Sequence, residues 1–241
     1  MDRFSRTELL LGPERSARLR SAFVAVVGLG GVGAPCAEAL ARCGVGRLLL
    51  IDGDRIIPSN INRHPWAVTG TLDVPKVLAG RERILGISPD IRVEARVEFV
   101  DETNLRTLLA EKPDVLVDAI DRVDVKVALL EAGWRGGVPV VSSMGAARRC
   151  DPSRIRTADL METKGCPLAR KVRLELKARG VGRGILCVYS DEVPAESCEE
   201  EGDRDETGRR PLGSLVTVTA AFGLHTASRA LDMITAEMER R

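Results

Sequence analysis

Short apolar runs alternate with longer amphipathic segments through the first half of the chain. Residues 24–27 and 48–51 are two such runs, and their β-branched and leucine side chains are typical of buried strands. Between them, residues 35–43 carry apolar side chains at helical spacing on one face. The pattern therefore predicts a strand–helix–strand unit.

The same alternation continues to residue 143. A predicted helical segment over residues 1–20 precedes the first unit. The further predicted helices span 73–85, 101–111 and 123–132, and the further predicted strands span 91–97, 114–119 and 138–143. Strands that alternate with helices in this way predict an α/β fold with a doubly wound, mostly parallel sheet.

Charge organises the second half of the chain. Residues 148–183 hold eleven basic against four acidic side chains, and residues 191–206 hold nine acidic against one basic. The basic stretch contains a predicted helix over 167–179, which begins with proline. The acidic, glycine-containing segment over about 193–213 predicts a mobile loop.

The turn after the first predicted strand carries three glycines at Gly-x-Gly-x-x-Gly spacing. Gly28 permits a tight turn, Gly30 lets the backbone approach a phosphate, and Gly33 lets the next helix pack close to the strand. The N-terminus of that helix offers unpaired N–H groups to an anion. Asp52, at the end of the second predicted strand, can bind ribose hydroxyl groups. These features predict a nucleotide site without specifying the nucleotide, and a glycine-rich structural turn is the alternative.

Polar and charged side chains follow the ends of the predicted strands, where open α/β sheets bind ligands. They are Asn60, Asn62, Arg63, Lys76, Asp118 and Asp121. Arg63 and Lys76 could neutralise phosphates, and Asp121 can hold Mg²⁺ through its carboxylate. Taken singly, each could be an ordinary surface residue. Together they favour ATP over NAD, because hydride transfer has no use for the cation pair.

The composition limits where the protein can be located and which classes of partner it can bind. The 241 residues are 44% apolar and 29% charged, and the sequence shows neither a signal-peptide pattern nor a transmembrane run. We therefore predict a cytoplasmic protein without membrane contact. The formal net charge is +1, so attraction to nucleic acid must be local. The candidates for a basic surface that binds RNA are Arg148, Arg149, Arg154, Arg170, Arg173 and Lys177.

Several motifs resemble those of the adenylyltransferases related to ubiquitin-activating enzymes. They are GLGGVG at 28–33, IDGD at 51–54, NINR at 60–63, Lys76, and DAID at 118–121. The resemblance implies ATP and Mg²⁺ as cofactors, with Asp52 serving the ribose and Asp121 the magnesium. The ATP-binding residues it implies are Gly28, Gly30, Gly31, Gly33, Asp52, Asp54, Asn60, Arg63, Lys76, Asp118 and Asp121. The catalytic residues it implies are Arg63, Lys76, Asp121 and Arg6. Arg6 resembles an arginine that is donated across a homodimer to the partner's ATP.

Motifs in the second half resemble the tRNA threonylcarbamoyladenosine dehydratases within that superfamily. They are SMGA at 143–146, DPSRIR at 151–156 and PLAR at 167–170. The resemblance implies ATP-dependent dehydration of N6-threonylcarbamoyladenosine in tRNA. In such a reaction the threonyl carboxylate forms an acyl adenylate with release of pyrophosphate, and cyclisation within the nucleoside then releases AMP. The implied partners are tRNA, a second copy of the chain and a sulfurtransferase-type protein.

These expectations describe a single domain over residues 1–241, with a nucleotide-binding half over 1–146 and a substrate-binding half over 147–241. One alternative is the adenylation of the C-terminus of a ubiquitin-like sulfur carrier. Against it, the six cysteines form no C-x-x-C pair of the kind that holds zinc in many sulfur-carrier activators. A second alternative is a nucleotide-binding adaptor without catalysis. Two positions depart from the family pattern: His64 stands in place of the usual glutamine, and Cys166 stands in place of the usual aspartate.

Overall fold

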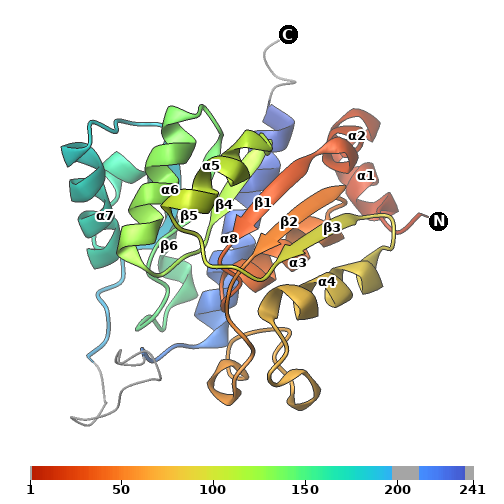
Figure 1. Ribbon diagram of the computed structural model, residues 1–241, viewed down its shortest axis with the longest axis horizontal. Helices are drawn as coiled ribbons and strands as arrows, with labels where there is room; N and C mark the ends of the chain where they lie inside the picture. The colour runs from red at the N-terminus through yellow and green to blue at the C-terminus, as the bar shows by residue number, and fades with distance from the viewer. Residues whose placement is uncertain (1, 197–211, 237–241) are drawn as a thin grey trace.

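A seven-stranded sheet, covered by helices on both faces, forms the centre of the computed structural model, which describes residues 2–196 and 212–236 (Figure 1). The strands are β1 (Phe23–Val27), β2 (Arg47–Ile51), β3 (Arg92–Arg96), β4 (Val115–Asp118), β5 (Val140–Ser143), β6 (Ile155–Asp159) and β7 (Ile185–Ser190). Their order is β3-β2-β1-β4-β5-β7-β6, and all neighbours are parallel except β6 and β7. The predicted doubly wound, mostly parallel sheet is confirmed.

The helices form two layers. They are α1 (Ser5–Leu11), α2 (Pro13–Ser21), α3 (Gly33–Arg42), α4 (Lys76–Ile87), α5 (Glu102–Ala110), α6 (Val123–Arg135), α7 (Pro167–Ala178) and α8 (Val216–Thr235). Strand β1 shows why both layers are needed, because all five of its residues are buried. Val24 and Val26 pack with the layer of α3 and α8, whereas Ala25 and Val27 pack with the layer of α5, α6 and α7. Successive strand side chains point to opposite faces, so a wholly apolar strand requires cover on both sides.

The predicted elements of the first half are present, with shifted ends. Helix α3 begins at Gly33, two residues before its predicted start, because the glycine turn leads directly into it. Helix α4 begins at Lys76 rather than at residue 73. Asp73 has a φ of 63°, in the left-handed region, and Pro75 forms the N-cap. Neither backbone conformation continues a helix, which explains the later start.

Strands β6 and β7 were not among the predicted elements. β6 is an edge strand with exposed Arg156 and Thr157, so it lacks the apolar run that marked the earlier strands. β7 is nearly all buried but lies between strongly charged segments. Because β7 pairs with β5, the second half extends the sheet of the first half.

Helix α8 carries the chain back across the sheet and packs along α3. The contact depends on Gly223, where a Cβ atom would lie 2.4 Å from the Val32 carbonyl oxygen. Helix α8, from the end of the chain, therefore packs against the first half of the protein. Of the acidic segment predicted to be mobile, residues 197–211 lie outside the described part of the chain. Across the residues that are described, none of the helices has the length and apolar character needed to cross a membrane.

Candidate active site

The glycine turn between β1 and α3 has little room for side chains at two positions and open space at a third. Gly28 has a φ of +85° and donates its N–H to the Ile51 carbonyl oxygen at 2.9 Å. At Gly33 a Cβ atom would lie 1.8 Å from the Gly28 carbonyl oxygen, so only glycine fits. At Gly30 no heavy atom lies within 4 Å of such a Cβ atom. The turn therefore presents open backbone at the N-terminus of α3, as an anion-binding cradle requires.

Asp52 ties this turn to the loop that follows β2. Its carboxylate accepts hydrogen bonds from the Leu29 N–H at 2.6 Å and from the Asp54 N–H at 2.8 Å. Burial raises the pKa of Asp52, and the charge of nearby Lys76 opposes that shift. Each carboxylate oxygen has a further lone pair, so Asp52 can hold the turn and still accept from a ribose hydroxyl group.

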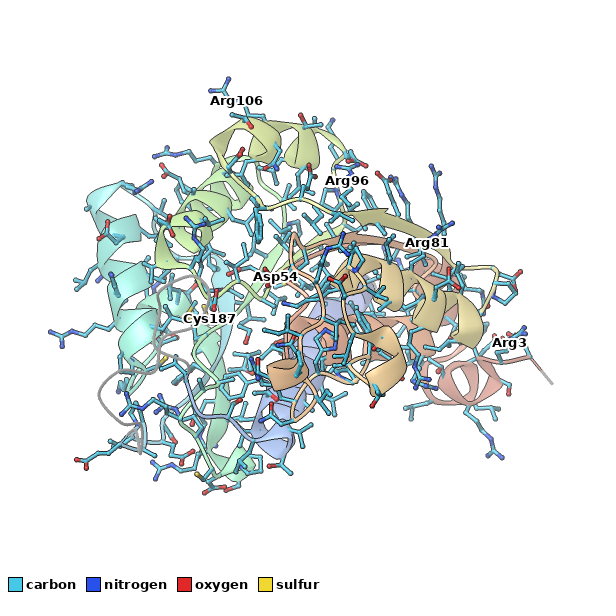
Figure 2. The ribbon with its side chains drawn as sticks, turned by 60° about the horizontal axis from the view of Figure 1, so that its bottom comes forward. Arg3, Asp54, Arg81, Arg96, Arg106 and Cys187 are labelled. Carbon is cyan, nitrogen blue, oxygen red and sulfur yellow. The ribbon has the colours of Figure 1, made fainter. Side chains whose placement is uncertain are left out.

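Lys76 and Asp54 form an ion pair beside the turn. The Lys76 Nζ atom lies 2.6 Å from Asp54 Oδ2, and the Lys76 side chain is only 9% exposed. The view onto the lower side of Figure 1 shows Asp54 near the centre of the molecule (Figure 2). As the structure stands, Asp54 orients the lysine, and the lysine is the group of this pair suited to a phosphate.

Arg63 lies in the segment after β2 and approaches Asp121, which follows β4. Arg63 donates to the Ser59 carbonyl oxygen at 2.6 Å and to Asn62 Oδ1 at 3.0 Å. Burial lowers the pKa of Arg63, and the negative charge of Asp121 opposes that shift. Asp121 is exposed, and its side chain makes no hydrogen bond within residues 2–196 and 212–236. An arginine and an unengaged carboxylate thus face the same edge of the sheet.

Asn60 shapes the backbone that carries Arg63. Its side chain is buried, and Oδ1 accepts from the Ile57 N–H at 3.3 Å. The Asn60 carbonyl oxygen accepts from the N–H groups of Arg63 and His64. Gly31 lies against the same segment, because a Cβ atom there would be 3.2 Å from Arg63 Cγ.

Asp118 does not line the open site, which corrects its expected contact with ATP. It is fully buried, and Lys126 Nζ and Ser142 Oγ both donate to its Oδ2 atom. Lys126 also donates to the Ser143 carbonyl oxygen at 2.9 Å, at the end of β5. Oδ1 accepts from the Ile120 N–H at 3.1 Å, one residue before Asp121. Asp118 thus organises the turn that presents Asp121.

Lys126 was not among the residues predicted for this site. The signal was a lysine on the apolar face of a predicted helix, next to Val127 and Leu130. Lysine is almost never fully buried unless it is paired, so its position predicts a buried acidic partner. Asp118, which ends the strand beneath, is that partner.

His64, one of the two residues that depart from the family pattern, supports the glycine turn at Leu29. It is 3% exposed, and its Nδ1 accepts from the Trp66 N–H at 3.2 Å. Its Nε2 lies 2.7 Å from the Leu29 carbonyl oxygen and must therefore carry the proton and donate it. Burial lowers the pKa of His64 to about 4, so the ring is neutral near pH 7.

This lowered pKa predicts a loss of stability in mild acid. The unfolded chain protonates His64 near pH 6.5 and the folded chain only near pH 4, so stability falls as the pH decreases through that window. Between pH 7 and pH 4.5 we expect this histidine to cost about 2 kcal/mol of unfolding free energy. Urea unfolding of His64→Gln at both pH values should show a drop smaller by that amount. His225→Gln, at an exposed position on α8, is the control, and equal drops in all three proteins would contradict the assignment.

Arg6 lies away from this edge of the sheet. It is exposed on α1, beside Phe4, and Phe4 packs at Gly44 just beyond the C-terminal end of α3. The glycine turn lies at the other end of this 10-residue helix, about 15 Å away. Arg6 therefore does not belong to the site formed by its own chain.

The predicted basic surface is only partly exposed. Arg170 and Lys177 are exposed on α7, and Arg154 is exposed but paired with Asp191 at 2.8 Å. Arg148 is half-buried and donates through Nε to the Ala195 carbonyl oxygen.

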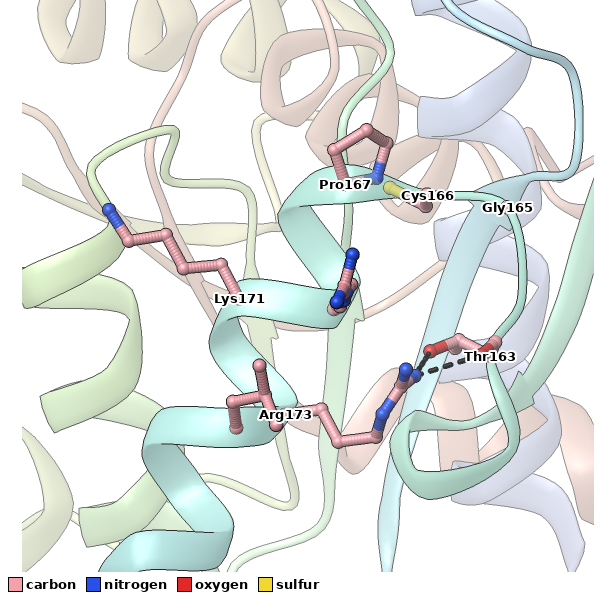
Figure 3. Close-up of a pocket in the computed structure, with 8 residues that line it drawn as sticks. Thr163, Gly165, Cys166, Pro167, Lys171 and Arg173 are labelled. Atoms are coloured by element: carbon pink, nitrogen blue, oxygen red, sulfur yellow. Dashed lines mark hydrogen bonds between the residues drawn. The ribbon is translucent and has the colours of Figure 1, made fainter.

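Two members of the predicted surface are engaged or buried instead. Arg173 reaches back over the start of α7 and donates to the carbonyl oxygen and hydroxyl group of Thr163 at 2.8 and 2.6 Å (Figure 3). It borders a surface hollow of about 530 Å³ with Arg170 and Lys171. Arg149 is buried.

Three cysteines of the second half are buried or lie outside the described residues. Cys187 is buried in β7, where burial raises the pKa of its thiol and disfavours the reactive thiolate. Cys166 is buried at the N-cap of α7, and its sulfur accepts from the Ala169 N–H at 3.5 Å. Cys198 falls in the segment that is not described.

The fold and the site together define an α/β nucleotide-binding protein with cations and an exposed carboxylate beside a phosphate cradle. The model of the ThiF family matches residues 4–241, and the chain belongs to that family. It is 37% identical over 231 residues to the tRNA threonylcarbamoyladenosine dehydratase of Bacillus subtilis, a match that covers 93% of this chain and 91% of the relative. Within the ThiF family, the chain therefore groups with the tRNA threonylcarbamoyladenosine dehydratases.

Two further comparisons separate this group from its neighbours. The crystal structure of the E. coli tRNA N6-threonylcarbamoyladenosine dehydratase in complex with AMP superposes with a TM-score of 0.91 at 35% identity, covering 99% of this chain and 96% of that one. The sulfur carrier protein adenylyltransferase of Thermus thermophilus is 36% identical over 145 residues, which covers only 58% of this chain. The likeness to the dehydratases thus extends through the second half, and the likeness to the sulfur-carrier enzyme covers little more than half of the chain.

Proposed function

We propose that this chain catalyses the ATP-dependent dehydration of N6-threonylcarbamoyladenosine in tRNA. The observation that carries the proposal is the full-length likeness to dehydratases, combined with a cradle, cations and carboxylate in one place. Structures of the E. coli relative hold AMP and ATP. Activation of a sulfur carrier is the weaker alternative, because its representative matches so much less of the chain.

The chemistry requires positioning and charge neutralisation more than a protein nucleophile. A threonyl carboxylate oxygen bonds to the α-phosphorus of ATP while the bond to pyrophosphate breaks. An N–H or O–H group of the same nucleoside then attacks the acyl carbon, loses its proton and displaces AMP, so the product is lighter by one water. In this proposal the glycine turn, Lys76 and Arg63 hold the phosphates, and Asp52 holds the ribose.

Magnesium fits this site as an ion shared with the nucleotide. Within the described residues, no group of three or more histidine, cysteine, aspartate or glutamate side chains could hold a metal alone. Mg²⁺ is typically bound by one or two carboxylates together with substrate phosphates. In this proposal the exposed carboxylate of Asp121 is that protein ligand, and the ion would neutralise charge on the phosphates.

Analysis of bulk tRNA tests the proposed function. Nucleosides from cells with and without this protein are compared by mass spectrometry. In tRNA from cells that lack the protein, we expect no species lighter than threonylcarbamoyladenosine by one water. That species should form when purified protein and ATP are added to the tRNA from those cells. An unchanged nucleoside profile would refute the function.

We also propose that the chain works as a homodimer with shared sites, as the position of Arg6 suggests. Mixing Arg6→Ala with Asp121→Ala protomers should restore about a quarter of the wild-type activity, because half of the dimers then carry one complete site. Mixing Arg6→Ala with the Arg6→Ala/Asp121→Ala double variant is the control and should restore none. If light scattering shows a monomer and that monomer has full activity, the two protomers do not share sites. We assign no surface to the sulfurtransferase-type partner, which stays a prediction.

The exposed face of α7 is the proposed tRNA-docking surface, within a second half that serves the substrate. Changing Arg170 and Lys177 to Glu should weaken tRNA binding and reduce the dependence of log Kd on log salt by about one for each lost phosphate contact. Arg173 is left unchanged, because it anchors the turn at Thr163. The control is Arg81→Glu with Arg106→Glu, two exposed arginines on α4 and α5 (Figure 2). Equal affinities and salt slopes in all proteins would argue against docking here.

A further inference from the structure

Arg149 is a buried cation whose Nε and Nη1 atoms find no partner among the described residues. Its side chain is 2% exposed, and its Nε and Nη1 atoms have no hydrogen-bond partner in the described structure. An ionised side chain removed from water without compensation is strongly destabilising. An anion supplied from outside the chain would offset the cost of this burial.

The backbone around Arg149 belongs to the same edge of the sheet as the nucleotide cradle. Arg149 lies on the segment that leaves β5, and β5 is the parallel neighbour of β4, which leads to Asp121. The N–H of the preceding residue, Arg148, donates to the Gly213 carbonyl oxygen at 2.8 Å. The carbonyl oxygen of Ser214, which follows Gly213 in the chain, accepts a hydrogen bond from the Asn62 side chain at 3.1 Å. The segments that carry Arg149 and Arg63 are thus bonded to two consecutive residues, Gly213 and Ser214.

The anions of the proposed reaction narrow the choice of ligand. The glycine turn, Lys76 and Arg63 already account for the phosphates of ATP. A phosphate of the RNA backbone is bulky and strongly hydrated, and it would be met by exposed side chains rather than by one that is 2% exposed. The anion left over is the threonyl carboxylate, which must lose its water before it can attack phosphorus.

We propose that Arg149 binds the threonyl carboxylate of the modified adenosine and holds it for attack on the α-phosphorus; this inference rests on the proposed function. A guanidinium grips a carboxylate along one of two edges, and each edge includes either Nε or Nη1. Both of those nitrogens are unsatisfied here. Arg149 would transfer no proton. It would orient one oxygen toward phosphorus and distinguish the modified nucleoside from plain adenosine.

The stability of an Arg149 variant distinguishes a role in ligand binding from a role in holding the fold together. Because the Nε and Nη1 atoms of Arg149 make no hydrogen bond within the described residues, Arg149→Met should unfold at a denaturant concentration no lower than that of the wild type. Arg81→Met, at an exposed position on α4, is the matched control. An unfolded or clearly destabilised Arg149→Met protein would overturn the inference, because the side chain would then be stabilising the fold.

Binding of two tRNAs tests the ligand. One tRNA carries threonylcarbamoyladenosine and the other carries plain adenosine at the same position, and affinities are measured without ATP. We expect the wild type and Arg81→Met to prefer the modified tRNA by about tenfold or more, and Arg149→Met to lose that preference. Arg149→Lys should retain part of it. The affinity for ATP, measured by calorimetry, should be the same in all four proteins.

The outcomes distinguish the inference from the function on which it rests. If the wild type dehydrates the nucleoside while Arg149→Met keeps the full preference, the inference is wrong and the function stands. If Arg149→Met binds both tRNAs more weakly by the same factor, the ligand is a backbone phosphate and the inference is wrong. If the wild type makes no dehydrated nucleoside, both are overturned.

Discussion

Asp121→Asn should abolish the dehydration of tRNA while leaving the fold unchanged. The substitution removes one negative charge from an exposed side chain that makes no hydrogen bond in the described part of the chain. Stability should therefore change by less than about 0.5 kcal/mol. The proposed Mg²⁺ ligand would be lost, and with it charge neutralisation on the phosphates in the transition state. We expect kcat/KM to fall by about 10³-fold, as for other losses of preorganised electrostatic groups.

The measurement is AMP release with a tRNA that carries threonylcarbamoyladenosine, across a range of Mg²⁺ concentrations. Asp124→Asn is a matched control, since Asp124 lies three residues further on, is exposed, and pairs with Arg122. It should retain wild-type activity. Activity of Asp121→Asn within a few fold of the wild type at every Mg²⁺ concentration would contradict the proposed role.

Lys126→Met should cause a large loss of stability. Lys126 and Asp118 are both fully buried, and removing the lysine leaves the Asp118 carboxylate charged, buried and short of a partner. Breaking one side of a buried ion pair typically costs about 3–5 kcal/mol. The loss also frees the end of β5, because Lys126 donates to the Ser143 carbonyl oxygen.

Urea unfolding measures this effect, and a double variant identifies its cause. Asp118→Asn added to Lys126→Met removes the orphaned charge while keeping an acceptor for the Ile120 N–H, so most of the stability should return. Lys171→Met, at an exposed position on α7, is the control and should change little. If Lys126→Met is as stable as the wild type, or if the double variant is the less stable of the two, the buried pair does not have the importance assigned to it.

Some residues of the site could be predicted from the sequence and others could not. Gly28 and Gly33 could be predicted because their conformational demands are local, and the structure gives the reasons in a positive φ and a 1.8 Å approach. Asp118 was placed correctly at a strand end but assigned to the open site. Whether a strand-end carboxylate faces solvent or the interior depends on which helix covers it, and here α6 supplies Lys126.

The basic surface shows the same limit more strongly. The sequence places Arg149, Arg170 and Arg173 in one basic stretch, and charge counting treats them alike. In the structure Arg170 is exposed, Arg173 anchors the turn at Thr163, and Arg149 is buried with no partner for Nε or Nη1 in the described part of the chain. Their roles differ because each guanidinium meets a different backbone, and that backbone comes from distant parts of the chain.

The sequence by itself determined the alternating elements, the parallel sheet and the glycine cradle, because hydrophobic periodicity and glycine geometry act over a few residues. It also determined the family resemblance, through motifs at fixed spacing. Only the tertiary structure decided that α8 returns to pack on α3, that His64 supports the turn at Leu29, and that Arg149 is buried. Each of these depends on contacts between segments far apart in the chain, and burial, which sets the cost of a charge, exists only once those segments have met.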